Sequence, residues 1–417
     1  MKLAGLITEY NPFHFGHRVH IENTKNLTGA SHIIAVMSGS FVQRGEPALV
    51  DKWTRAEMAI KNGVDLVVEL PFIYSVQTAE LFASGSTKIL ESINSTDYLV
   101  FGSESGNIDE LDSIASILAF EPPLFKKLLK EHLNYGNSFS VSRSLALKDY
   151  AEANGIELGD TLSIIKESNN ILGIEYLKSL KRLESSIIPI TFQRLGDKYS
   201  ELEVKSEIAS ATAIRHRIKE NGIESAIELL PQSSYDSIFS FIKKYGKVNG
   251  LGNYSQIINY LLCVKSATDI SDYFDVEIGL ENRIKDLSRI SSDPLELIKA
   301  ISTKRYTETR IQRMLIHMLV DLKKEAILDA FSNEPGYIRV LASNKKGFEI
   351  INKIKENSEI EIINKLSDSM NKLNKTNKSI LLLDILATDL YYLGLDLIKP
   401  EIGMDFKKSP YINIHNG

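Results

Sequence analysis

The stretch LITEYNPFHFGH, residues 6–17, decides the fold. Its first residues end an apolar run, 2–8, that is typical of a buried strand. Its last residue begins a segment, 17–27, that is typical of a helix. His14 and His17 stand three positions apart, and Gly16 between them lets the backbone approach a ligand closely. Because the first turn of a helix has free N–H groups that attract anions, this corner predicts a phosphate site with the imidazoles as donors. The alternative is that one or both histidines only cap the helix.

The rest of the first half alternates strand and helix patterns. Continuous apolar runs at 32–39, 64–71, 97–105 and 186–194 predict buried strands, and the segments 51–63 and 79–93 between them predict helices. Such alternation is typical of a parallel sheet covered on both faces, whose ligands bind beyond the carboxyl ends of the strands. We therefore predict an α/β, Rossmann-like domain over 1–222.

The second half reads differently. Residues 223–417 carry apolar side chains at steps of three and four, which predicts a mainly α-helical domain, and 337–344 is the one strand-like interruption. The segment 299–324 holds seven Lys and Arg against two Asp and Glu, in a chain of net charge −5. Any surface for a polyanion outside the first domain should therefore lie there.

Composition limits the class of protein. The 417 residues are 43% hydrophobic and 25% charged, which is ordinary for a globular protein. No run approaches the roughly 20 apolar residues of a membrane span, and the N-terminus lacks the features of a signal peptide. The single cysteine, Cys263, excludes an internal disulfide and is expected to be a small buried hydrophobe. We expect a cytoplasmic protein with no membrane contact, and the sequence identifies no protein partner.

The HxGH spacing of His14, Gly16 and His17 resembles the signature of the nucleotidyltransferase superfamily, and no P-loop is present. A second superfamily signature, a serine- and threonine-rich turn ending in Ile-Arg, is matched by IASATAIR, residues 208–215, although Ala209 and Ala211 flank Ser210. The resemblance implies a Rossmann-like parallel sheet and cleavage of ATP between its α- and β-phosphates. It assigns catalysis to His14, His17 and Arg215.

Longer blocks carry a closer resemblance. GLITEYNPFHFGH, VMSGSFVQRGEPALVDKWTRAEMAI, FGSESG, SNNILGIEYLKSL and STKRYTETRIQRMLIHMLV are together similar to the bacterial tRNA(Met) cytidine acetate ligase family. The resemblance implies that ATP and acetate give acetyl-adenylate, and that the acetyl group passes to the exocyclic amine of the wobble cytidine in elongator tRNA(Met). The ATP-binding residues that the resemblance implies are Ile7, Thr8, Glu9, Tyr10, Asn11, Pro12, Phe13, His14, Phe15, Gly16, His17, His20, Gly102, Asn169, Arg194, Ser210, Thr212 and Arg215. Asn170 stands beside Asn169, so the choice between these two as the nucleotide contact stays open.

The loop 38–53 joins the second strand to the second helix and should lie at the same edge of the sheet. We expect it to border the acetate or cytidine pocket: its Gly, Ser and Arg44 suit a mobile loop that handles anions, and Lys52 and Arg55 lie on the first turn of the following helix. Either Glu9 or Asp51 is a candidate to take the proton of the cytidine amine. Trp53 is expected to pack rather than to stack on a base.

The segment TKRYTETRIQR, 303–313, is the candidate tRNA-binding surface. Lys304, Arg305, Arg310 and Arg313 are its cations, and a solvated helix face is the alternative interpretation. Lys345 and Lys346 are candidates to extend this surface. Metal-ligand spacings are not evident, so Mg²⁺ is expected to be carried by the phosphates of ATP.

Two rival functions share some of these features. A small-molecule adenylyltransferase of cofactor biosynthesis would share both signatures, but it would not explain roughly 190 helical residues with a basic segment. A non-catalytic RNA-binding scaffold would bind ATP without forming an adenylate, and the intact histidines of the HxGH signature count against it.

Overall fold

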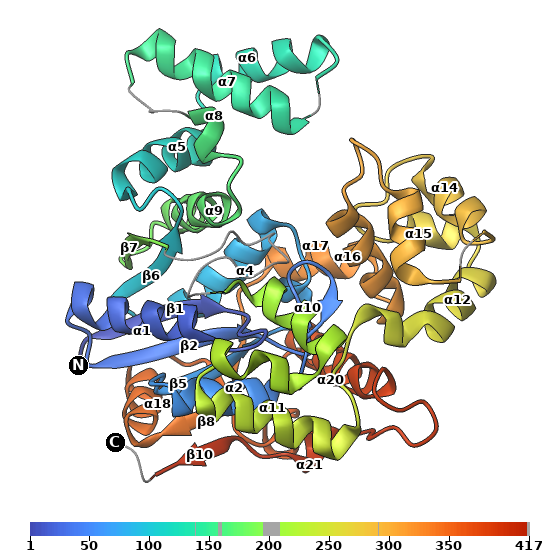
Figure 1. Cartoon of the computed structure of the whole chain (residues 1–417). Coiled ribbons are helices and arrows are strands. Elements are labelled where there is room, and N and C mark those ends of the chain that lie inside the picture. The colour runs from blue at the N-terminus through green and yellow to red at the C-terminus, as the bar shows by residue number, and fades with distance from the viewer. Residues whose placement is uncertain (138, 157–160, 195–208, 291, 415–417) are drawn as a thin grey trace.

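One mixed sheet forms the centre of the molecule (Figure 1). The computed structural model describes residues 1–137, 139–156, 161–194, 209–290 and 292–414. Within these ranges the sheet has eight strands in the order β10-β8-β5-β2-β1-β6-β7, with β9 also paired to β8. The strands are β1 (Leu3–Thr8), β2 (His32–Ser38), β5 (Leu66–Leu70), β6 (Tyr98–Ser103), β7 (Ile188–Gln193), β8 (Tyr337–Asn344), β9 (Glu361–Ile363) and β10 (Tyr411–Asn413), and a separate hairpin is formed by β3 (Phe41–Val42) and β4 (Glu46–Pro47).

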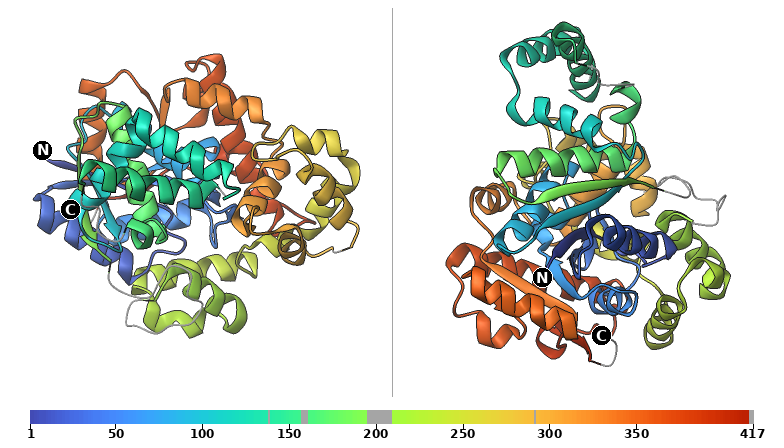
Figure 2. Two further views of the ribbon diagram at one scale, coloured as in Figure 1. Left: turned by 90° about the horizontal axis from the view of Figure 1, so that it is seen from above. Right: turned by 90° about the vertical axis from the view of Figure 1, so that its left-hand side faces the viewer.

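The strands that the first half contributes to the main sheet, β1, β2, β5, β6 and β7, are parallel, as predicted. Every residue of β2 and β5 is buried, since helices cover both faces of the sheet and leave no side that faces water. The helices of this half are α1 (Phe15–Thr28), α2 (Lys52–Lys61), α3 (Phe72–Ser75), α4 (Ala79–Ser92), α5 (Ile108–Phe120), α6 (Pro123–Asn134), α7 (Phe139–Asn154), α8 (Thr161–Ile164), α9 (Ser168–Arg182) and α10 (Ala211–Asn221). Of these, α6 and α7 stand away from the sheet (Figure 2).

The second half is mainly helical, as predicted, but it also completes the sheet. β8 pairs antiparallel with β5, and β9 and β10 pair parallel with β8. The sheet therefore crosses the boundary predicted at residue 222. The strand-like pattern at 337–344 marks β8, but its partner lies more than 260 residues earlier, and local periodicity carries no information about such pairing.

The helices of the second half are η1 (Ile223–Leu229), α11 (Gln232–Tyr245), η2 (Leu251–Tyr254), α12 (Ser255–Val264), α13 (Ala267–Ser271), α14 (Leu280–Leu287), α15 (Pro294–Ile301), α16 (Glu308–Leu319), α17 (Lys324–Ser332), α18 (Lys345–Asn357), α19 (Leu366–Ser369), α20 (Lys375–Leu393) and α21 (Met404–Lys407). None of the helices in the described ranges is long and apolar enough to cross a membrane. Cys263 lies in the last turn of α12 and is exposed, so its expected burial is wrong. The apolar run around it has a solvent-facing side at this position.

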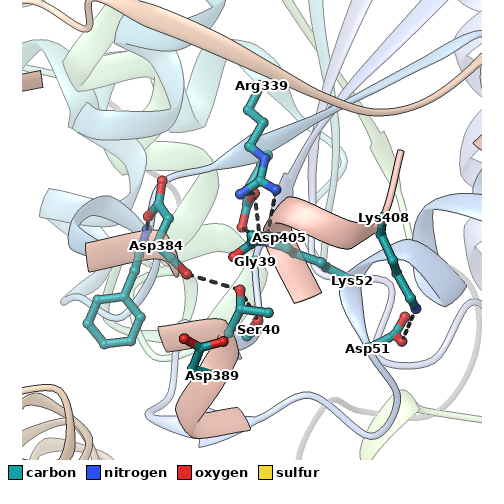
Figure 3. Close-up of polar contacts among 12 residues, drawn as sticks. Gly39, Ser40, Asp51, Lys52, Arg339, Asp384, Asp389, Asp405 and Lys408 are labelled. Carbon is teal, nitrogen blue, oxygen red and sulfur yellow. Dashed lines mark hydrogen bonds and ion pairs between the residues drawn. The ribbon is translucent and has the colours of Figure 1, made fainter. Parts of the chain in front are cut away.

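Buried ion pairs tie the two halves together (Figure 3). Lys52 Nζ lies 2.7 Å from Glu69 Oε1 and 2.9 Å from Asp405 Oδ1, and Arg339 contacts the same two carboxylates. All four side chains are at most 5% exposed. Because an unpaired charge is costly to bury, the C-terminal residues Arg339 and Asp405 are needed to complete the core beneath the loop after β2.

Candidate active site

The corner between β1 and α1 has an unusual cap. The Nδ1 atom of His14 accepts a hydrogen bond from the backbone N–H of Gly16 at 3.0 Å, and the Nδ1 atom of His17 accepts from the N–H of His14 at 3.2 Å. The two imidazole centroids are 4.0 Å apart. The histidines therefore cap α1, and they also line a cavity. Capping and phosphate binding, which the sequence left as alternatives, use different ring atoms.

These hydrogen bonds fix the tautomers. In a neutral ring an Nδ1 that accepts carries no proton, so Nε2 is the protonated nitrogen and a donor. Burial, followed by the charges of Arg194 and Arg215, lowers the pKa of His14 to about 3. Burial also places the pKa of His17 well below its usual range. Both rings are therefore neutral at pH 7 and present N–H donors without the desolvation cost of a buried cation.

The cavity has a volume of about 430 Å³ and opens at the carboxyl ends of β1 and β6. Twelve of the predicted ATP-binding residues line it: Ile7, Thr8, Glu9, Tyr10, Asn11, His14, His17, His20, Gly102, Asn169, Arg194 and Ser210. Six do not: Pro12, Phe13, Phe15, Gly16, Thr212 and Arg215. Residues that sequence reasoning did not place there are Ala79, Phe82, Phe101, Ser168, Ile171, Leu172, Tyr176, Ala211 and Thr309.

Arg215 lies behind the cavity wall and is buried. Its Nη1 donates to the carbonyl of Asn11 at 2.9 Å, and its Nη2 lies 2.9 Å from Glu46 Oε1 and 3.4 Å from the hydroxyl of Thr212. The guanidinium thus holds the β1–α1 loop and supplies positive charge to His14 from behind. Ser210 caps α10 by accepting from the N–H of Ala213 at 3.1 Å.

The two neighbouring asparagines have different positions. Asn170 is buried, and its Oδ1 accepts from the backbone N–H groups of Glu104 and Ser105 at 2.9 and 3.0 Å. Asn169 lines the cavity and accepts from Arg194 Nη1 at 3.2 Å. Of the two, Asn169 is therefore the one placed to contact a ligand.

Gly102 is the last residue but one of β6, at the point where Arg194 crosses the strand. A Cβ atom at Gly102 would lie 2.7 Å from Arg194 Cγ and 3.2 Å from Phe192 Cζ. Only glycine allows the arginine to lie in this position across the strand end.

Lys52 and Arg55 are structural, which corrects the expectation that they border a substrate pocket, whereas Gln43 and Arg44 of the same loop do line the cavity. Lys52 belongs to the buried ion pairs described above. Arg55 is fully buried and donates to the carbonyls of Glu9, Ser38, Gly39 and Val50. It therefore joins the loops after β1 and β2 beneath the cavity.

Asp51 also lies away from the cavity. It caps α2 through the N–H of Thr54 and contacts Lys408 and the hydroxyl of Tyr392, each at 2.7 Å. Trp53 is 6% exposed, packed as expected, with Lys408 Nζ 4.7 Å from its ring. Asp51 is thus not placed to act on a substrate in the cavity.

Glu9 does line the cavity. Its Oε1 accepts from the backbone N–H of Gln43 at 3.0 Å, and burial raises the pKa of its carboxyl despite this bond and the nearby Arg215 and Arg44. A raised pKa makes this carboxylate a better proton acceptor than an ordinary glutamate.

The predicted tRNA segment divides between surface and interior. Lys304 and Arg305 are exposed, and Arg305 contacts Glu277. Arg310 lies 2.9 Å from Glu277 Oε1. Arg313 is only 8% exposed and lines the cavity, so its side chain is not part of the surface.

Lys345 and Lys346 begin α18, far from α16 (Figure 1), and do not extend the candidate tRNA-binding surface. Within the described ranges, no three His, Cys, Asp or Glu side chains are grouped to hold a metal ion.

Known proteins resemble this chain over its whole length. The family model described as HIGH Nucleotidyl Transferase matches residues 1–403. The tRNA(Met) cytidine acetate ligase of Thermoanaerobacter sp. (strain X514) is 46% identical over 411 residues, covering 96% of this chain and 100% of the relative. The ligase of the same name from Clostridium perfringens is 41% identical over 415 residues, covering 99% and 100%.

Two solved structures of Thermotoga maritima TmcAL share the fold. The apo form superposes with a TM-score of 0.95 at 32% identity, and the form bound with alpha-thio ATP with a TM-score of 0.92 at 31% identity. Each comparison covers 99% of both chains. The chain belongs to the HIGH nucleotidyl transferase family and, within it, to the tRNA(Met) cytidine acetate ligases.

Proposed function

We propose that the protein joins acetate to a tRNA cytidine in two steps at the cavity beyond β1. In the first, a carboxylate oxygen of acetate attacks the α-phosphorus of ATP, and pyrophosphate leaves with the electron pair of the broken P–O bond. In the second, the exocyclic amine of the wobble cytidine of elongator tRNA(Met) attacks the acyl carbon, AMP leaves, and N4-acetylcytidine is formed. The location we propose is the cytoplasm, where tRNA and ATP meet.

The observation that carries the proposal is the histidine pair in a chain that matches cytidine acetate ligases from end to end. Acetate is already an anion, so the first step needs positioning and charge stabilisation rather than a base. The Nε2–H groups of His14 and His17 are assigned to phosphoryl oxygens at the reacting phosphorus. Ser210, at the N-terminus of α10, is assigned to the leaving pyrophosphate, and Arg215 behind the cavity wall adds positive charge there without contacting it. Mg²⁺ would be held mainly by the phosphates and water.

The second step releases a proton from the attacking amine. Glu9 is assigned as its acceptor, because it lines the cavity and its pKa is raised, whereas Asp51 lies elsewhere. Lys304 and Arg305 are assigned to RNA phosphates, because among the cations predicted for tRNA binding they are the exposed ones. Both assignments rest on position and charge.

Incubation with ATP, labelled acetate and total bacterial tRNA tests the proposal. We expect label in one tRNA species, and its loss in His17→Ala. A requirement for a mononucleotide instead of acetate in ATP–pyrophosphate exchange would favour a small-molecule adenylyltransferase. Binding of ATP with no exchange under any condition would favour a non-catalytic scaffold.

A further inference from the structure

The cavity extends to both sides of β1. Arg194 follows β7 and Arg44 lies in the β3–β4 hairpin that follows β2, and in the sheet order β2-β1-β6-β7 these two strands lie on opposite sides of β1. The side of β6 and β7 holds Gly102, Asn169 and Arg194, the residues assigned to the nucleotide. The side of β2 has no assigned ligand.

Two guanidinium groups meet on the β2 side. Arg44 lies in the β3–β4 hairpin, with Nη2 3.4 Å from the hydroxyl of Ser168 at the start of α9. Arg313 comes from α16, lines the same cavity, and is balanced only in part by Asp275, whose carboxylate lies 3.6 Å from Nη2. The buried Nε of Arg313 has no hydrogen-bond partner among the described residues.

The hairpin and α16 are packed closely enough to bring these groups together. Gly45 has a φ of +82°, and a Cβ atom there would collide with the backbone of Arg313. Glycine therefore allows the hairpin to abut the helix. Burial lowers the pKa of Arg313, with a contribution from the charge of Arg44, so an arriving anion would relieve repulsion between the two.

An apolar wall lies beside these arginines. Ser168, Ile171 and Leu172 are spaced to share one face of α9, and all three line the cavity. Ala79 and Phe82 of α4 line it as well. A cationic pair next to a short apolar wall matches a small carboxylate with a short alkyl group.

We propose that Arg44 and Arg313 bind the carboxylate of the acid substrate, and that Ala79, Phe82 and Leu172 enclose its alkyl group and limit its length. The inference rests on the proposed function and names the acid-binding part of the same site. One oxygen of the bound carboxylate attacks the α-phosphorus, the bond from that phosphorus to the bridging oxygen of pyrophosphate breaks, and no proton is transferred. The arginines position the nucleophile on the side of the corner opposite to Arg194.

Acetate-dependent ATP–pyrophosphate exchange without tRNA tests the arginines. In Arg44→Gln and Arg313→Gln we expect the KM for acetate to rise about ten- to hundredfold, since each loses a hydrogen bond between charged groups. The Kd of a non-hydrolysable ATP analogue, measured by calorimetry, should stay within about twofold. Arg44→Gln keeps the test interpretable if Arg313→Gln fails to fold, because Arg44 lies on a hairpin and is less buried than Arg313.

Arg289→Gln is the matched control, because Arg289 is an exposed arginine in the same helical half of the chain and lies outside the cavity. Its KM for acetate should equal that of the unaltered protein. A weaker Kd for the ATP analogue with an unchanged KM for acetate in both cavity variants would overturn the inference and assign the arginines to the triphosphate. Absence of acetate-dependent exchange in the unaltered protein would refute the proposed function itself, and the inference would fall with it.

The preference of the enzyme for acids of different chain length tests whether the apolar wall limits the size of the acid. Leu172→Ala should raise kcat/KM for propionate relative to acetate by about tenfold, because it makes room for one methylene. Leu177→Ala, on the same helix but outside the cavity, should keep the original preference. A weaker Kd for the ATP analogue in Leu172→Ala, with the acid preference unchanged, would overturn this part and assign the wall to the nucleotide.

Discussion

The rings of His14 and His17 lie side by side: their centroids are 4.0 Å apart, and the backbone N–H of His14 donates to Nδ1 of His17. The bond that caps α1 also orients the second ring. Removing either imidazole should therefore affect helix capping and phosphate binding together, unless the replacement retains the cap.

His14→Asn separates the two roles. Asparagine is a favourable N-cap, so the free energy of unfolding should change by less than about 1 kcal/mol. The Nε2–H donor is lost, and adenylation should slow by about 10²–10³-fold, the usual cost of one donor at a developing charge. Urea unfolding and acetate-dependent exchange measure the two effects. Full activity with an intact fold would refute the role of the ring.

The same variant should change acid stability. The pKa of His14 is about 3 in the folded protein and near 6.5 when unfolded, so the unfolded state binds the proton first as pH falls. The stability that the neutral ring contributes is present above pH 6.5 and is lost progressively toward pH 3. Between pH 6.5 and 5 the unaltered protein should lose about 2 kcal/mol more free energy of unfolding than His14→Asn. Equal losses would show that the ring is not kept neutral by burial.

Local patterns in the sequence predicted the parallel half of the sheet and the histidine corner, because a buried strand and a helix start are each encoded by neighbouring residues. They did not predict that β8 to β10 join the same sheet. Those pairings depend on contacts between residues more than 60 positions apart, at β8 with β10, or more than 260, at β8 with β5.

The lining of the cavity could likewise be predicted from local sequence patterns only in part. Residues 7–11, His14 and His17 line it as the motif suggested, but Arg313 and Thr309 reach it from a helix that the charge pattern placed on the surface. A run of lysines and arginines records charge and not burial. The expectation for Lys52 and Arg55 is wrong for the same reason, since Asp405, which pairs with Lys52, and the carbonyl of Glu9, which accepts from Arg55, lie far from them in sequence.

Gly102→Ala should disturb the nucleotide side of the cavity. The added methyl group would lie 2.7 Å from Arg194 Cγ, so the arginine must move away from the strand end. We expect the Kd of an ATP analogue to rise by about tenfold or more, as for the loss of one charged contact. Gly252→Ala is the control, because a Cβ there meets no atom within 4 Å. Unchanged affinity in Gly102→Ala would remove Arg194 from the nucleotide site.

Lys52→Met should be among the most destabilising single changes. It leaves the buried carboxylates of Glu69 and Asp405 with Arg339 as their remaining cation, and breaking a buried pair costs about 3–5 kcal/mol. Lys61→Met removes the partly exposed pair with Glu57 on the same helix and should cost less than about 1 kcal/mol. Thermal and urea unfolding measure the difference. Equal effects would mean that the buried network adds nothing beyond its surface counterpart.

Asp384 gives the fold a pH dependence of opposite sign. Its oxygens accept from the N–H of Phe72 at 2.7 Å and from the hydroxyl of Tyr337 at 2.6 Å. Burial, with repulsion from Glu69, raises its pKa to about 7, above the unfolded value of 3.8. The stability it contributes is therefore present below about pH 3.8 and is lost as pH rises through 7. Asparagine keeps an acceptor for Phe72 and removes the charge.

Relative to the unaltered protein, Asp384→Asn should gain about 2–3 kcal/mol in free energy of unfolding between pH 5 and pH 7. Urea unfolding at the two pH values measures this gain. The exposed Asp368→Asn serves as control and should follow the unaltered protein at both. If the free energy of unfolding of Asp384→Asn changed between pH 5 and pH 7 by the same amount as that of the unaltered protein, the prediction would be wrong. The carboxyl would then already be ionised at pH 5, and the charge of Lys52 would outweigh burial at this position.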